Sequence, residues 1–69
     1  MHVVYTEHAW ERMQFRKIEQ AWVEETIRRP DILTVIGRKH IAVRRLNGHT
    51  LKAVYVKEKY IKIVTLYWY

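Results

Sequence analysis

Three basic side chains near the start of the chain have the spacing and the chemistry to handle a phosphate group. His8, Arg12 and Arg16 are each four residues apart, so on a helix they form one stripe. Histidine is the side chain best suited to exchange a proton near neutral pH, and a guanidinium offers a planar set of donors to phosphate oxygens. The alternative is a histidine that caps or packs the helix, with both arginines paired to acids.

A second group of candidate residues lies in the C-terminal half of the chain. Asn47-Gly48 is a strong signal for a two-residue hairpin, and we expect a second turn of this kind at Glu58-Lys59. Because side chains alternate between the faces of a strand, the two turns decide which residues share a face and place Lys52 opposite Thr65. The polar residues gathered at one end of this face are Arg45, Thr50, Lys52, Thr65 and Tyr67.

This polar cluster suits an RNA backbone. Arg45 would present its planar donors to a phosphate, and Lys52 would add a point charge. Tyr67, which the same turns place opposite Thr50, would stack on a base or donate its hydroxyl. The alternative is a solvated sheet face with the Lys, Thr and Tyr side chains that such faces usually carry.

The rest of this face is aliphatic, while the opposite face has small residues. Ala42 and Ala53 lie on that opposite face, so we expect it to pack against helices and the polar cluster to face outward. The aliphatic end would then lack a cover. A second copy related by a two-fold axis is the simplest partner, with a neutralising protein as the rival. The aliphatic residues concerned are Ile41, Val43, Val54, Val56, Ile61 and Ile63.

The elements that position these residues follow from capping signals and from a change of period along the chain. Thr6 is a good N-cap for a helix over residues 7–16, and Pro30 ends a second helix over residues 19–29. The strands that we expect cover residues 2–5, 31–36, 40–46, 50–56 and 61–69. The prediction is therefore an α+β fold, with two N-terminal helices on one face of a four- to five-stranded antiparallel β-meander. The strand over 50–56 is expected at its centre.

The charge of the chain is distributed unevenly. Its formal net charge is +6, from 13 Lys and Arg against 7 Asp and Glu. Up to Asp31 there are five basic and six acidic residues, whereas from Ile32 onward there are eight basic residues and one acid. Such a bias favours a surface that faces RNA or another polyanion, although it also serves solubility. The contacts expected for nucleic acid are Arg16, Lys17, Arg38, Lys39, Thr50 and Thr65.

Several functional classes lack support in the sequence. The chain of 69 residues has no cysteine, which excludes disulfides and thiolate metal sites, and its four histidines have no metal-ligand spacing. No phosphate-cradling glycine loop or nucleophile elbow is present, so we expect no metal and no cofactor. No segment reaches the length of a bilayer span, and the first six residues do not resemble a secretory signal. We expect one domain over residues 1–69, located in the cytoplasm.

The first-helix residues also carry a family resemblance. The pattern Glu7-His8-Ala9-x-x-Arg12-Met13-x-x-Arg16-x-Ile18 resembles the opening of the domain of unknown function family 4258, which continues with an acidic helix that ends before a proline. That family closes its β-meander on Thr-x-Tyr, here Thr65-Leu66-Tyr67. Lys17 stands where the family usually has glycine, a difference that bears on the break between the helices.

The resemblance implies a RelE/ParE-like fold, within the superfamily of barnase-, EndoU-, colicin- and RelE-type ribonuclease toxins. It implies that His8, Arg12 and the strand with Thr65 and Tyr67 form the site. It also implies an antitoxin-like protein as a partner.

Three hypotheses follow. In the first, the protein is a metal-independent RNA endonuclease, in which Lys52 or His8 removes a proton from a ribose 2′-hydroxyl. Arg12 and Arg45 would stabilise the charge on the phosphate, and Tyr67 would orient the RNA. In the second, the same face binds nucleic acid or a protein without catalysis. In the third, the exposed sheet is a homodimer interface. In all three, we expect the helix residues Trp10 and Trp22 to serve the core or a dimer contact.

Overall fold

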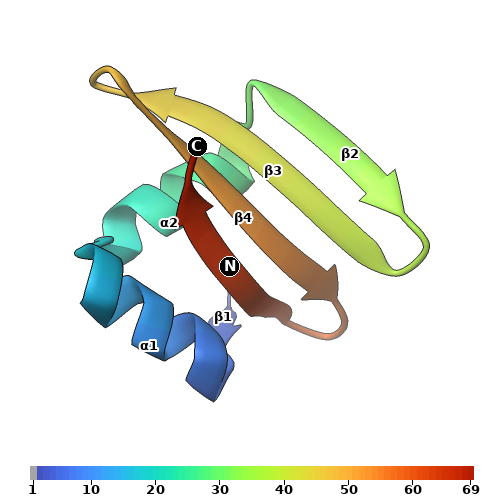
Figure 1. Ribbon diagram of the computed structural model, residues 1–69. Helices are drawn as coiled ribbons and strands as arrows, with labels where there is room; N and C mark the ends of the chain where they lie inside the picture. Colours follow the sequence, from blue (N-terminus) through green and yellow to red (C-terminus); the bar gives the residue numbers. More distant parts are fainter. Residues whose placement is uncertain (1) are drawn as a thin grey trace.

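The fold is a single five-stranded sheet with two helices on one side of it (Figure 1). The computed structural model describes residues 2–69, and the spatial order of the strands is β1-β5-β4-β3-β2. The elements are β1 (Val3–Tyr5), α1 (Glu7–Arg16), α2 (Gln20–Arg28), β2 (Ile32–Ile36), β3 (Lys39–Leu46), β4 (His49–Lys57) and β5 (Ile61–Trp68). The expected α+β class and the central place of β4 between β3 and β5 are therefore confirmed.

The sheet is mixed, so the prediction of a purely antiparallel sheet was wrong. The four strands β2 to β5 form the expected meander, but β1 pairs with β5 in parallel, with Val3 opposite Ile61 and Tyr5 opposite Ile63. The turn residues specify only strands that are adjacent in the sequence. The pairing of β1 with β5 joins the two ends of the chain, and no turn signal reports on it.

The register between β4 and β5 also differs from the expected one. The connecting loop has three residues, because Lys57 pairs with Ile61, and a further shift of register follows between Val54 and Tyr55. Lys52 consequently lies opposite Tyr67 rather than Thr65. Each irregularity moves the register by one residue, so together they return the end of β5 to its expected face.

The first half of β5 lies before this second shift, and its side chains point to the other face. Ile61 and Ile63, which were expected on the uncovered side of the sheet, are instead buried in the core beneath the helices. Of the six aliphatic residues predicted on the uncovered side, four remain there. They are Ile41, Val43, Val54 and Val56, all half-buried.

The core lies where small sheet residues let the helices approach, as predicted. Ala42 and Ala53 are fully buried, and α2 packs against β4 and β3 while α1 packs against β5 and β1 (Figure 1). Trp22 on α2 packs against this core, at 5.8 Å between ring centroids from Trp68. Trp10 is 46% exposed and lies outside the core, so of its two expected roles only a dimer contact stays a prediction. Its ring meets the edge of Tyr5 instead.

Helix α1 is fixed at both ends by the residues that flank it. The Thr6 hydroxyl accepts a hydrogen bond from Ala9 N at 3.0 Å and donates to the Val64 carbonyl at 3.1 Å, which ties the start of the helix to β5. Lys17 ends the helix in the left-handed conformation, with φ of 54°. Glycine adopts this conformation without steric cost, which explains why the resembling family usually has glycine at the position that Lys17 occupies here.

Candidate nucleic-acid interface

The basic stripe of α1 lies beside the last half of β5, and a groove runs between them. Strand β1 pairs only with the first half of β5, so the edge of the second half is left to α1. The hollow at this place has a volume of about 460 Å³. Its walls are formed by Arg12, Arg16, Thr65, Tyr67 and Trp68, which we call the basic groove.

Arg16 fixes the groove in place. Its Nη1 donates to the Leu66 carbonyl at 3.1 Å, and its own carbonyl accepts a hydrogen bond from Trp68 Nε1, also at 3.1 Å. These two contacts clamp the end of α1 to the edge of β5. A guanidinium has five N–H donors, so the bond to Leu66 leaves others that can meet an anion in the groove.

His8 lies at the margin of this groove rather than inside it. Its Nε2 accepts a hydrogen bond from Arg12 Nε at 3.3 Å, and its exposed ring lines a neighbouring hollow with Trp10 and Phe15. The nitrogen that accepts from Arg12 cannot bind a proton at the same time. A role for His8 as a base therefore requires that Arg12 turns away, for example onto a phosphate.

Lys52 extends the site onto the uncovered face of the sheet. Its Nζ lies 5.4 Å from the ring centroid of Tyr67 and 5.4 Å from that of Tyr69. Both distances are within the range of a cation–π contact. Tyr69 is 79% exposed and was not among the predicted site residues, although the alternation that begins at Thr65 and Tyr67 leads to it.

Arg45 and Thr50 occupy the next row of the same face. They lie opposite each other, and the Thr50 carbonyl accepts a hydrogen bond from Tyr69 N at 2.7 Å. The backbone N–H of Arg45 donates to Asp31 Oδ2 at 2.8 Å, while its side chain is exposed. These two residues continue the surface beyond Lys52 but do not line the basic groove.

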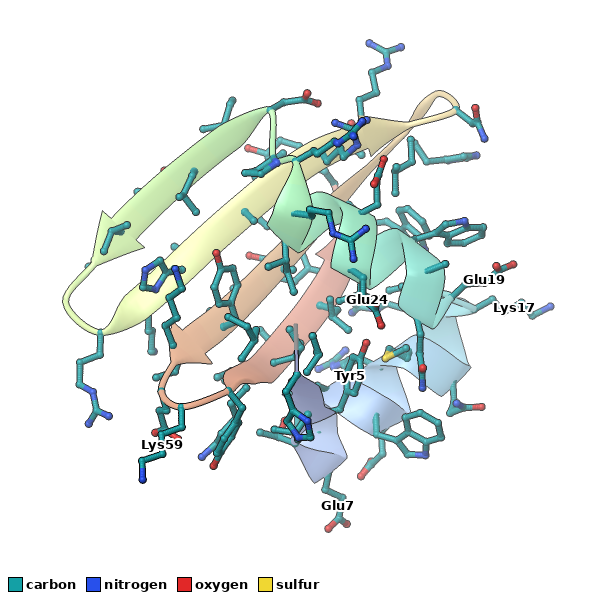
Figure 2. The ribbon with its side chains drawn as sticks, turned by 180° about the vertical axis from the view of Figure 1, so that it is seen from behind. Tyr5, Glu7, Lys17, Glu19, Glu24 and Lys59 are labelled. Atoms are coloured by element: carbon teal, nitrogen blue, oxygen red, sulfur yellow. The ribbon has the colours of Figure 1, made fainter. Side chains whose placement is uncertain are left out.

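The other expected nucleic-acid contacts are not brought to the groove. Arg38 lies in the turn between β2 and β3 and forms an ion pair with Glu58 at 3.5 Å, near the opposite end of the sheet. Lys39 begins β3 opposite Val56, at that same end. Lys17 projects from the junction of α1 and α2 into solvent (Figure 2) and borders a separate hollow with Trp22.

Among residues 2–69, no acid forms an ion pair with the cations of the groove. Within residues 2–69 the ion pairs use Arg38 and Arg44, and none of them uses Arg12, Arg16 or Lys52. Arg44 forms an ion pair with Glu25 at 3.6 Å and donates a hydrogen bond to the Arg29 carbonyl. These two contacts hold the end of α2 on β3.

The tyrosines that burial perturbs lie outside the groove. Burial, followed by the nearby charge of Glu24, raises the pKa of Tyr5, whose side chain lies beside Glu24 between the helices (Figure 2). Burial also raises the pKa of Tyr55. Both phenols therefore stay protonated and serve the core. In the described part of the chain, no group of three or more His, Asp or Glu side chains is arranged to hold a metal ion.

The fold and the groove together define a small α+β protein whose first helix and last strand enclose a basic cleft. Residues 5–68 match the family described as domain of unknown function (DUF4258), and the chain belongs to this family. The comparisons with curated proteins and with solved structures gave no match. None of the helices described between residues 2 and 69 has the length and hydrophobicity to cross a membrane.

Proposed function

We propose that this protein binds RNA in the basic groove. The observation that carries the proposal is the meeting of Arg12 and Arg16 from α1 with Thr65 and Tyr67 from β5 around one hollow. Two guanidiniums without an acidic partner suit phosphates, and the phenol ring suits a base that stacks on it. Lys52, beside Tyr67, adds a positive charge on the path by which a strand would leave the groove over the sheet.

We further propose that the bound RNA is cleaved without a metal ion. Lys52 or His8 would take the proton of a ribose 2′-hydroxyl, whose oxygen then attacks the adjacent phosphorus. As this bond forms, the bond from phosphorus to the 5′-oxygen breaks, and the departing oxygen takes a proton from water. The products would be a 2′,3′-cyclic phosphate and a 5′-hydroxyl end. Arg12 would stabilise the charge on the phosphate, Tyr67 would orient the RNA, and Arg45 would contact the strand where it continues beyond Lys52.

The proposal also covers the class of toxin, its location in the cell and a protein partner. The order of two helices followed by a meander, with a basic site at the last strand, supports a RelE/ParE-like toxin. We propose a cytoplasmic location and an acidic, antitoxin-like protein that neutralises the +6 charge of the chain. A partner that covers the groove would block RNA directly.

Binding is expected to weaken steeply as salt is added. Three contacts to single-stranded phosphates, from Arg12, Arg16 and Lys52, correspond to a loss of affinity on the order of 10-fold between 50 and 200 mM salt, because counterions are released on binding. Titration of a fluorescent single-stranded RNA at several salt concentrations measures the slope. If no binding is detected at the lowest salt concentration, the nucleic-acid proposal fails.

Cleavage is tested separately from binding. In EDTA, the protein is expected to cut a single-stranded RNA and to leave cyclic phosphate ends, which mass spectrometry identifies. The same RNA with a single 2′-deoxy nucleotide at the cut site is expected to bind equally well and to remain intact there, since the attacking hydroxyl is missing. Tight binding of the all-ribose RNA with no products would reject catalysis and retain binding.

A non-catalytic RNA-binding module is the second candidate. The observation that favours it is the contact between Arg12 Nε and His8 Nε2, which occupies the nitrogen that a base would need. The groove itself is lined by arginine, threonine, tyrosine and tryptophan side chains, which suit phosphates and stacked bases. The EDTA experiment separates the two candidates.

A further inference from the structure

Strand β2 is an apolar sheet edge, and no other element described between residues 2 and 69 pairs with its outer side. It pairs with β3 on one side, and Figure 1 shows it as the outermost strand, at the edge of the sheet opposite β1. All five of its residues are exposed, including Ile32 at 61% and Ile36 at 62%. Sheet edges in monomers are usually protected by charged residues, proline or a bulge. Ile32–Ile36 contains neither a charged residue nor a proline.

The sequence of β2 is complementary to itself when it is reversed. Its residues are Ile-Leu-Thr-Val-Ile, so an antiparallel copy that is centred on Thr34 places isoleucine opposite isoleucine and leucine opposite valine. An interface between identical chains related by a two-fold axis requires this kind of self-complementary surface. A hetero-partner would impose no such symmetry on the strand.

The backbone of β2 offers the hydrogen bonds for this pairing. Ile36 and Lys39 flank the two-residue turn between β2 and β3, so their backbone groups bond to each other, and Thr34 likewise faces β3. The intervening residues, Leu33 and Val35, direct their N–H and C=O groups to the free edge. In the centred arrangement these two residues lie opposite each other across the axis, where each can exchange both of its hydrogen bonds.

The side chains and charges around the strand agree with the same arrangement. Ile32 lies beside Val43, and Thr34 beside Ile41, so pairing would extend the aliphatic side of the sheet across the axis. Asp31 precedes the strand, whereas Arg38 follows it closely. Antiparallel pairing brings the acid of one copy near the base of the other at both ends of the interface, where Asp31 also accepts from Arg45 N and Arg38 also pairs with Glu58 within each subunit.

We propose that β2 pairs with β2 of a second copy across a two-fold axis at Thr34, so that one sheet continues through both subunits. The assembly closes at two copies, because a two-fold contact uses the same β2 edge of both subunits and leaves no further β2 edge free. The basic grooves then lie at the two far ends of the dimer and remain open. The proposal does not depend on the function of the groove.

Charge substitutions at Thr34 test the proposal directly. The residue is exposed, so the fold tolerates change there, and it meets only itself in the dimer. Thr34→Lys and Thr34→Glu are each expected to be monomeric in sedimentation velocity at concentrations where the unmodified chain has twice its mass of 8.5 kDa, because like charges face each other at the axis. An equimolar mixture of the two variants is expected to restore the dimer.

The matched controls are Gln20→Lys and Gln20→Glu, at an exposed position on α2, which should remain dimeric singly and when mixed. Circular dichroism of each Thr34 variant checks that the fold is retained. An unmodified chain that stays monomeric up to about 500 μM overturns the proposal. A dimer that survives both Thr34 substitutions, or one that the mixture fails to restore, also overturns it, because the contact would then lie elsewhere.

Discussion

Replacement of both Arg12 and Arg16 by glutamine is expected to lower the affinity for RNA by at least about 100-fold at low salt. Each guanidinium would lose a charge-assisted contact to phosphate worth about 1.5–3 kcal/mol, or roughly 10- to 100-fold in affinity. The dependence of log affinity on log salt should become shallower by about 0.7 for each phosphate contact that is lost. Titration of labelled RNA with each single and double variant gives both quantities.

The matched control for this experiment is the pair Arg28→Gln and Arg29→Gln at the end of α2. Both side chains are exposed, and the loss of two positive charges is the same. A comparable loss of affinity in this control would mean that RNA binding depends only on the net charge of the protein, and the basic groove would not be the binding site. Because Arg16 also donates to the Leu66 carbonyl, the melting temperature of each variant must be measured, whereas the side chain of Arg12 donates to His8 on its own helix.

The face on which the candidate residues lie could be predicted because local signals determine it. Asn47 and Gly48 both have positive φ, as a two-residue hairpin turn requires, and Arg45 pairs with Thr50 and Val43 with Lys52 as expected. The stripe of His8, Arg12 and Arg16 needed only helical periodicity. Its position against β5 was implied by the family resemblance and could not be obtained from spacing.

The register of the last hairpin could not be predicted, because its turn residues specify no particular loop. Glu58, Lys59 and Tyr60 include no glycine, asparagine or proline, so a two-residue and a three-residue loop fit the sequence equally well. The shift of register between Val54 and Tyr55 could not be predicted either, because no glycine near it indicates a bulge. The two errors cancelled for Thr65 and Tyr67, which stayed on the predicted face, but not for Ile61 and Ile63.

The sequence was least able to predict which basic residues lie near one another along the sheet. Arg38 and Lys39 belong to the basic half of the chain and were included on charge alone. They lie at the far end of the sheet from Arg45 and Thr50. The net charge of a chain indicates the sign of the charge on its partner, but it does not indicate where that partner binds. The free edge of β2 was not among the predictions, although the expected meander already places this strand at one end of the sheet.

The substitution Leu51→Ala is expected to remove a large part of the free energy of unfolding, so that part of the protein is unfolded at 37 °C. Leu51 lies on the central strand β4 and is fully buried, and removal of such a leucine side chain costs about 2–5 kcal/mol. A domain of this size has a total stability of roughly 3–10 kcal/mol, from about 0.05–0.15 kcal/mol per residue. With no cysteine in the chain, no disulfide is available to compensate for the lost packing.

The same change at Leu46 is the matched control. Leu46 is half-buried at the end of β3, so Leu46→Ala leaves a smaller cavity or none, and we expect a melting temperature several degrees below that of the unmodified chain rather than loss of the fold. Thermal and urea unfolding followed by tryptophan fluorescence reports both variants, because Trp22 and Trp68 lie in contact beside this part of the core. If Leu51→Ala melted as high as Leu46→Ala, the layer between β4 and α2 would not be the main source of stability, and the burial of Leu51 beneath α2 would be refuted.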